Sequence, residues 1–144
     1  LQQQLFEQSL HIDRVVVGSG SSGTHGGMVA AFLANRINIT LTGIGVSRDP
    51  EDQVPLVLCE AQAVCDLLEL GITVREDMVQ CVGGFWQPKY SVPNAAMVEA
   101  VQLLARTEGI LRSPWYHVES TLTQTTFEIW NLDLWKSIIS TRIS

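Results

Sequence analysis

Glycine and serine residues between positions 18 and 24 form the segment with the clearest chemical potential. Gly18, Gly20 and Gly23 alternate with serines, directly after three valines and before a stretch that can start a helix near Thr24. Glycines let the backbone turn sharply and approach a ligand closely. The first amides of a helix lack intrahelical partners and lie at the positive end of its dipole, so the segment predicts a cradle for an anion such as phosphate. The dipole contributes only about 0.3–1 kcal/mol, so converging hydrogen bonds must supply most of the binding.

Two nucleotide-binding motifs can be compared with this loop. A Walker phosphate loop is excluded, because Thr24 and His25 stand where that motif needs a lysine. The spacing of the three glycines does satisfy the dinucleotide fingerprint, which also needs an acid about 20 residues on to hold the ribose. Asp49 is the only acid near that place, and the proline after it is more typical of a helix start.

Two further interpretations remain for the same loop. Ser19-x-Ser21-x-Gly23 is similar to a loosened nucleophile elbow, with Ser21 at the turn from strand to helix. A hydrolase of that kind needs a downstream acid and histidine, and His117 is the only histidine after the loop region. The alternative without chemistry is a plain glycine-rich turn.

Strands and helices are predicted to alternate around this loop. The valine run at 15–17 favours a strand buried on both faces, because β-branched side chains pack well on a pleat and a parallel sheet has no solvated side. Residues 39–47 predict a second strand, and residues 74–82 a further strand or an irregular segment. A helix is expected within residues 26–35. Its apolar face comprises Met28, Val29, Phe32 and Leu33.

Start and stop signals indicate two more helices. Asp49 and Pro50 predict the cap and first residue of one helix, which ends at Gly71. Its core stripe is Val54, Leu58, Ala61, Cys65 and Leu68. The other follows Pro93-Asn94 and ends at Gly109. Its apolar face is Met97, Val101, Leu104 and Ala105. The alternation predicts an α/β fold, a three-layer parallel sheet with flanking helices and a site at the carboxyl ends of the strands.

Composition limits the classes of protein to which this chain can belong. The 144 residues allow one domain, and 46% apolar content with 17% charged residues indicates a globular chain. The net charge of −6 and the scattered basic residues argue against nucleic-acid binding. We expect a cytoplasmic protein without membrane contact, because no apolar run approaches the ~20 residues that span a bilayer and no signal peptide is evident. The three cysteines suit small buried apolar residues better than a disulfide framework or a zinc site. A start at Leu1 suggests a fragment or a processed product.

The chain changes character after Leu111. Three of the four tryptophans lie in residues 112–144, together with many serines and threonines. One helix face is expected there, at Phe127, Trp130, Leu134 and Ile138. The segment is either an ordinary helix docked on the core or a tail that does not belong to the same fold. We therefore divide the chain into a partial α/β domain at 1–111, which contains the glycine and serine loop, and a tail at 112–144.

Several linked segments resemble a known enzyme family. They are Val15 to Gly27 with Thr24-His25, Ser47-Arg48 with Asp52-Gln53, Tyr90 to Asn94, and Ala105 to Leu111. Together they resemble the fold type II pyridoxal phosphate enzymes that include D-cysteine desulfhydrase, L-cysteate sulfo-lyase and 1-aminocyclopropane-1-carboxylate deaminase. The match covers about residues 12 to 111, and the loop is closest to the desulfhydrase form.

The resemblance implies pyridoxal phosphate as cofactor and a set of site residues. The cofactor phosphate would be held by amides and hydroxyls of the loop, at Ser19, Gly20, Ser21, Ser22, Gly23 and Thr24. Tyr90 would lie beside the substrate, with Ser91 in place of the family's glycine. Tyr116 would correspond to a second tyrosine, in a segment that keeps only its proline and tyrosine. No metal is implied.

The parent enzyme suggested by the resemblance is a homodimeric lyase or deaminase acting on a small amino acid. The preferred reaction is conversion of D-cysteine to pyruvate, hydrogen sulfide and ammonia. Lys89 and Lys136 are the only lysines, and neither stands in the family's pattern for the lysine that holds the cofactor covalently, so we expect this fragment alone to be inactive. Two other functions are kept: a nucleotide-binding domain, and a non-catalytic module whose tail aromatics contact a partner.

Overall fold

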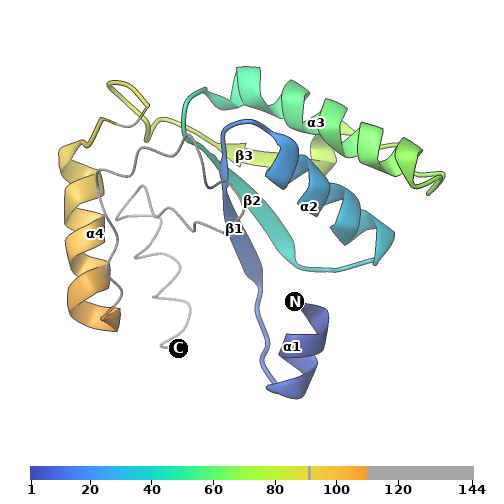
Figure 1. The fold of residues 1–144 in the computed structure, drawn as a ribbon, viewed down its shortest axis with the longest axis horizontal. Coiled ribbons are helices and arrows are strands. Elements are labelled where there is room, and N and C mark those ends of the chain that lie inside the picture. The colour runs from blue at the N-terminus through green and yellow to red at the C-terminus, as the bar shows by residue number, and fades with distance from the viewer. Residues whose placement is uncertain (91, 110–144) are drawn as a thin grey trace.

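The computed structural model describes residues 1–90 and 92–109 (Figure 1). The expected helix face at 127–138, Tyr116 and His117 lie outside these residues. Along the chain the elements are α1 (Gln2–Glu7), β1 (Arg14–Ser19), α2 (Gly23–Ala34), β2 (Thr40–Gly45), α3 (Pro50–Leu67), the 3₁₀ turn η1 (Glu76–Met78), β3 (Gln80–Val82) and α4 (Ala95–Glu108). The alternation of strands and helices predicted from the sequence is confirmed.

The three strands form one parallel sheet in the order β1-β2-β3. Val17 is level with Gly43 of β2, and Gly43 is level with Cys81 of β3. Val15 and Val17 are buried, whereas Val16 is half-buried, so burial of β1 is greater on one face than on the other. The parallel α/β architecture with flanking helices agrees with the fold class expected from the sequence.

The main core lies where α2 and α3 pack together against the sheet (Figure 1). The buried face of α2 consists of His25, Gly26, Val29 and Ala30. The expected face was wrong in part, because Met28 and Phe32 are only half-buried. Small side chains face inward because α3 crosses this helix closely.

The core stripe of α3 also differs from the expected one. Its buried residues are Gln53, Val57, Ala61 and Cys65, while Val54 and Leu58 only pack against the cluster. Leu68 is 60% exposed and follows the last helical residue, so the helix ends before Gly71. The stripe begins with a polar residue because Gln53 has hydrogen-bonding partners in the loop after β1.

The remaining elements follow the expected pattern. Residues 74–82 contain both predicted alternatives, the irregular η1 and the short strand β3. Helix α4 begins after Asn94 and ends before Gly109, which has a φ of +67° that glycine tolerates. No helix among residues 1–90 and 92–109 is long and apolar enough to span a bilayer.

Gly26→Ala is expected to destabilise the fold by about 1–2 kcal/mol, because overpacking of a core costs about 1–3 kcal/mol and the helix propensity of alanine offsets part of it. A Cβ at Gly26 would lie 2.6 Å from Glu60 Cβ and 3.0 Å from the backbone nitrogen of Ala61 on α3. Gly27→Ala is the matched control, since its Cβ would meet nothing within 4 Å. Urea denaturation should show the first variant destabilised and the second unchanged or stabilised. Equal effects would contradict close packing of α2 on α3.

Candidate anion-binding site

The glycine and serine loop lies at the carboxyl end of β1, where it turns into α2 (Figure 1). Ser19 is the last residue of the strand, and Gly23 is the first residue of the helix. Between them Ser22 is the N-cap residue, with a φ of 77°. The Val46 amide donates to the Ser19 carbonyl oxygen at 3.2 Å, which places the carboxyl end of β2 beside the loop. In parallel α/β sheets, ligands bind at this edge.

The loop serines divide into two sets. Ser19 and Ser22 are buried, and both hydroxyls have partners inside the protein. Ser21 and Thr24 are exposed, as is Gly23 between them. The sequence-based prediction treated all four hydroxyls alike as phosphate ligands. In this structure the hydroxyls of Ser21 and Thr24 are the ones accessible to a ligand, together with the backbone.

Gln53 is the main internal partner of the loop, and its side chain is fully buried. From α3 its Nε2 reaches Ser19 Oγ at 2.9 Å, the Gly20 carbonyl oxygen at 3.2 Å and Ser22 Oγ at 3.2 Å. The two amide hydrogens are thus distributed over three acceptors. The opposite orientation would place an amide oxygen against the carbonyl oxygen of Gly20, so the assigned orientation is favoured.

Arg48 adds a positive charge beside the loop. Its Nη1 donates to the Gly20 carbonyl oxygen at 2.8 Å and lies 3.4 Å from Gln53 Oε1. The side chain is exposed, so its charge is also available to an anion outside the loop. In the sequence, Arg48 and Gln53 support only the family resemblance and are not predicted as site residues. A glutamine at the start of an apolar helical stripe is the signal that could have identified the second of them.

His25 lies beneath the loop, in the first turn of α2. The residue is 1% exposed, and its Nδ1 is 3.0 Å from Ser19 Oγ. Because Ser19 already accepts a hydrogen bond from Gln53, its own hydrogen is free to point to Nδ1. That arrangement puts the imidazole proton on Nε2, which has no hydrogen-bond partner among the described residues. Burial lowers the pKa of His25 to about 4, so the ring is neutral near pH 7.

The start of α2 has the properties of a phosphate site. Ser22 makes no side-chain capping hydrogen bond, since its hydroxyl instead accepts one from Gln53. The first amides of the helix are therefore not capped by this residue. Space outside the loop is open, because a Cβ at Gly23 would meet nothing within 4 Å. Backbone amides, two accessible hydroxyls and a nearby guanidinium are the donors that a phosphate group requires.

The nucleophile-elbow interpretation gains no support from this geometry. Ser21 has no hydrogen-bond partner within residues 1–90 and 92–109, and the histidine nearest in sequence, His25, is buried and bonded to Ser19 instead. The described part of the chain also lacks a cluster of histidine, cysteine or acidic residues able to hold a metal. A groove lined by η1, β3 and Val54 contains none of the loop residues.

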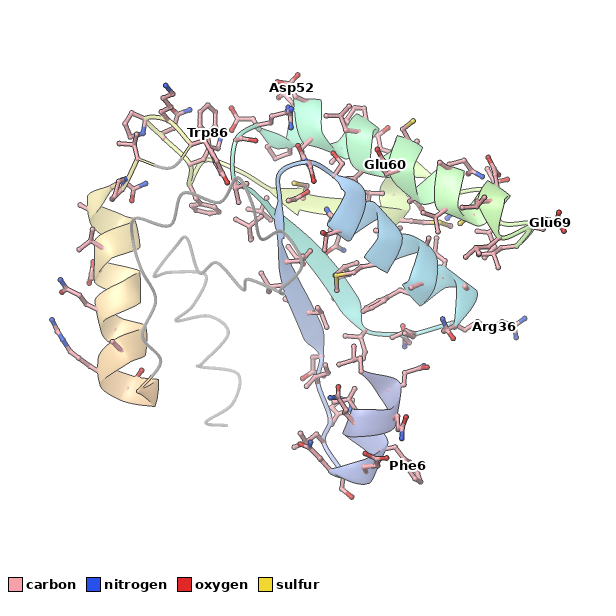
Figure 2. The ribbon with its side chains drawn as sticks, in the orientation of Figure 1. Phe6, Arg36, Asp52, Glu60, Glu69 and Trp86 are labelled. Carbon is pink, nitrogen blue, oxygen red and sulfur yellow. The ribbon has the colours of Figure 1, made fainter. Side chains whose placement is uncertain are left out.

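Tyr90, the predicted substrate-side tyrosine, lies in the segment between β3 and α4 and is 46% exposed. This segment is anchored at the start of α3, where Trp86 Nε1 donates to Asp49 Oδ1 at 3.2 Å (Figure 2). Asn94 Nδ2 holds it further by donating to the carbonyl oxygens of Phe85 and Gln87, each at 3.0 Å. The role of Tyr90 stays a prediction.

Phe85 links this segment to the sheet. It packs against the buried pair Ile44 and Val46 at the carboxyl end of β2. Val46 in turn borders the loop, since its Cγ2 lies 3.0 Å from where a Cβ at Gly20 would stand. The segment that carries Tyr90 is thus attached at the same edge of the sheet as the loop.

One comparison with known proteins bears on this site. Residues 1–116 match the family model described as pyridoxal-phosphate dependent enzyme. The match contains the loop, Arg48, Gln53 and Tyr90, and it extends into the segment after residue 111.

Proposed function

Because the chain belongs to the family of pyridoxal-phosphate dependent enzymes, we propose that its loop from Ser19 to Thr24 binds the phosphate group of that cofactor. The observation that carries the proposal is the start of α2, where Ser22 does not cap the helix and the space around Gly23 is open. The amides of this turn would donate to the phosphate oxygens, with the hydroxyls of Ser21 and Thr24 beside them. Arg48 would add attraction for the dianion.

The proposed reaction is an elimination on a small amino acid, with D-cysteine as the preferred substrate. When bound, pyridoxal phosphate supplies an electron sink for charge that develops at the carbon next to the amine. The residues described above would fix the phosphate end of the cofactor and so its position at the carboxyl ends of the strands. Support for D-cysteine comes from Thr24-His25 after the loop and from Ser47-Arg48 after β2, which resemble the desulfhydrase branch.

The phosphate site is tested by a pair of variants that differ only in charge. Gly23→Asp places a carboxylate in the open space at the start of α2, while Gly23→Asn places a neutral side chain of the same shape there. Repulsion of the phosphate should weaken binding of pyridoxal phosphate at least tenfold in the aspartate variant relative to the asparagine variant. The aspartate should not destabilise the helix, because acids are favourable in its first turn.

Titration with pyridoxal phosphate and with pyridoxal, followed by protein fluorescence, gives the affinities. Wild-type protein should prefer the phosphorylated compound, and Gly23→Asp should abolish the preference. Equal affinity of the wild type for both compounds would contradict the proposed site.

The substrate is tested with the protein expressed from its complete reading frame and supplied with pyridoxal phosphate. Sulfide release from D-cysteine should exceed sulfide release from L-cysteine, and ammonia release from 1-aminocyclopropane-1-carboxylate should be slower. Faster turnover of the cyclopropane substrate would assign the deaminase reaction instead.

A further inference from the structure

Gln53 donates hydrogen bonds to three acceptors of the loop, although it lies more than 30 residues away along the chain. We infer that Gln53 is a positioning residue that holds the loop in the shape that receives the phosphate. The inference rests on the proposed function, and it concerns how α3 controls the loop rather than which atoms touch the cofactor.

Gln53 engages the hydroxyl of Ser22, the residue at which α2 starts. An N-cap serine ordinarily turns its oxygen to a free amide of the helix that it starts. Here Gln53 Nε2 donates to Ser22 Oγ at 3.2 Å, and no side-chain cap is formed. The left-handed backbone of Ser22 also differs from the extended conformation in which a serine usually caps a helix, and the bond to Gln53 helps to hold the hydroxyl in this arrangement. Without Gln53, the serine could cap the helix itself and compete with an external phosphate for the same donors.

The turn that Gln53 contacts has a strained backbone. Ser22 has a φ of 77°, in the left-handed region that non-glycine residues rarely adopt. Such a conformation persists only where the surroundings determine it. Gln53 bonds the residues on either side of Ser21, through the Gly20 carbonyl oxygen and Ser22 Oγ. The turn is thus held from inside while its outer side remains open.

The side chain of Gln53 is itself fixed by its neighbours. Its Oε1 lies 3.4 Å from Arg48 Nη1, and Arg48 also donates to the Gly20 carbonyl oxygen. On its other side the hydrogen bond to Ser19 continues to Nδ1 of the buried His25. The carboxamide is therefore fixed between a guanidinium and an imidazole, and a change in its side chain is transmitted to the loop.

The test compares Gln53→Met with Gln62→Met, which is a matched control on the same helix. Gln62 also makes structural hydrogen bonds from its carboxamide, donating to the Ile72 carbonyl oxygen at 3.1 Å and accepting from the Val74 amide at 2.8 Å. Neither contact involves the loop. Methionine keeps the length of glutamine and removes its polar atoms, so both variants lose structural hydrogen bonds of a carboxamide on α3, and only one loses those of the loop.

Binding is measured on the full 144-residue chain with inorganic phosphate, followed by the amide signals of Gly23 and Thr24 in two-dimensional NMR spectra. Gln53→Met should raise the dissociation constant at least tenfold, and Gln62→Met should leave it within twofold of the wild-type value. Should Gln53→Met fail to fold, Gln53→Asn replaces it with the same expected weakening, because its shorter carboxamide cannot reach all three acceptors and adds no charge near the phosphate.

The outcomes separate this inference from the proposed function. If the wild type shows saturable shifts, then unchanged affinity in the folded Gln53 variant, or equal weakening in both glutamine variants, would overturn the positioning role alone. Absence of any phosphate-dependent shift at Gly23 and Thr24 in the wild type would overturn the phosphate site itself, and with it the inference.

Discussion

Gly43→Ala is expected to destabilise the protein by about 3 kcal/mol or more, the sum of an overpacked core and a buried polar group left without its partner. A Cβ at this position of β2 would overlap the imidazole of His25, at Cε1 and Nδ1. The ring is 1% exposed and has no room to withdraw. Displacing it would also break its 3.0 Å hydrogen bond to Ser19. Thermal and urea denaturation of the variant measure the loss.

A double-variant cycle identifies the cause of that loss. In a His25→Ala background the alanine at position 43 has no ring to displace, so it should cost much less than in the wild type. The coupling between the two positions should exceed about 1 kcal/mol, within the range of about 0.5–3 kcal/mol seen for groups in direct contact. Strictly additive effects would contradict the close approach of His25 to β2.

Acid should destabilise the protein through His25 by about 3 kcal/mol between pH 6.5 and pH 4, since one pKa unit corresponds to 1.36 kcal/mol. Burial lowers the pKa of this imidazole from 6.5 to about 4 in the folded state. The unfolded chain therefore takes up the proton first as the pH falls. The contribution to stability is complete above pH 6.5 and is lost progressively toward pH 4.

The free energy of unfolding measured at half-unit steps of pH tests this expectation. His25→Asn keeps an acceptor near Ser19 Oγ and removes the titration, so its stability should be nearly flat across this window. His11→Gln is the control, because His11 is exposed and contacts only Asp13, at 3.0 Å, among the described residues. A wild-type profile that is flat between pH 6.5 and 4 would show that the ring is charged or accessible in the folded protein.

These predictions converge on one structural unit behind the loop. His25, Ser19 and Gln53 form a continuous chain of hydrogen bonds that joins α2, β1 and α3. None of the three side chains is exposed. In the proposed function these side chains would fix the turn that receives the phosphate, and the backbone amides and exposed hydroxyls of the loop would face it.

The sequence by itself determined the order of the elements from β1 to α4 and the position of the turn, whereas α1 (Gln2–Glu7) was not predicted. β-branched valines before a run of glycines and serines can form little other than a strand followed by a tight turn, because local sterics decide both. The stop at Gly109 and the start at Pro50 depend on similarly local backbone preferences. The family resemblance depended on the same local segments, and the match over residues 1–116 confirms it at the level of pyridoxal-phosphate dependent enzymes.

Only the tertiary structure decided which loop hydroxyls face a ligand and which are internal. Ser19 and Ser22 have the same chemistry in the sequence as Ser21, and the difference arises because Gln53 reaches the first two across more than 30 residues. In the sequence His25 is a polar residue after the loop, and nothing near it predicts that it is buried. Its burial depends on the space that Gly43 leaves on a neighbouring strand. Such contacts join segments that are distant along the chain, so no local pattern of residues predicts them. They form because α2 and α3 pack on the sheet.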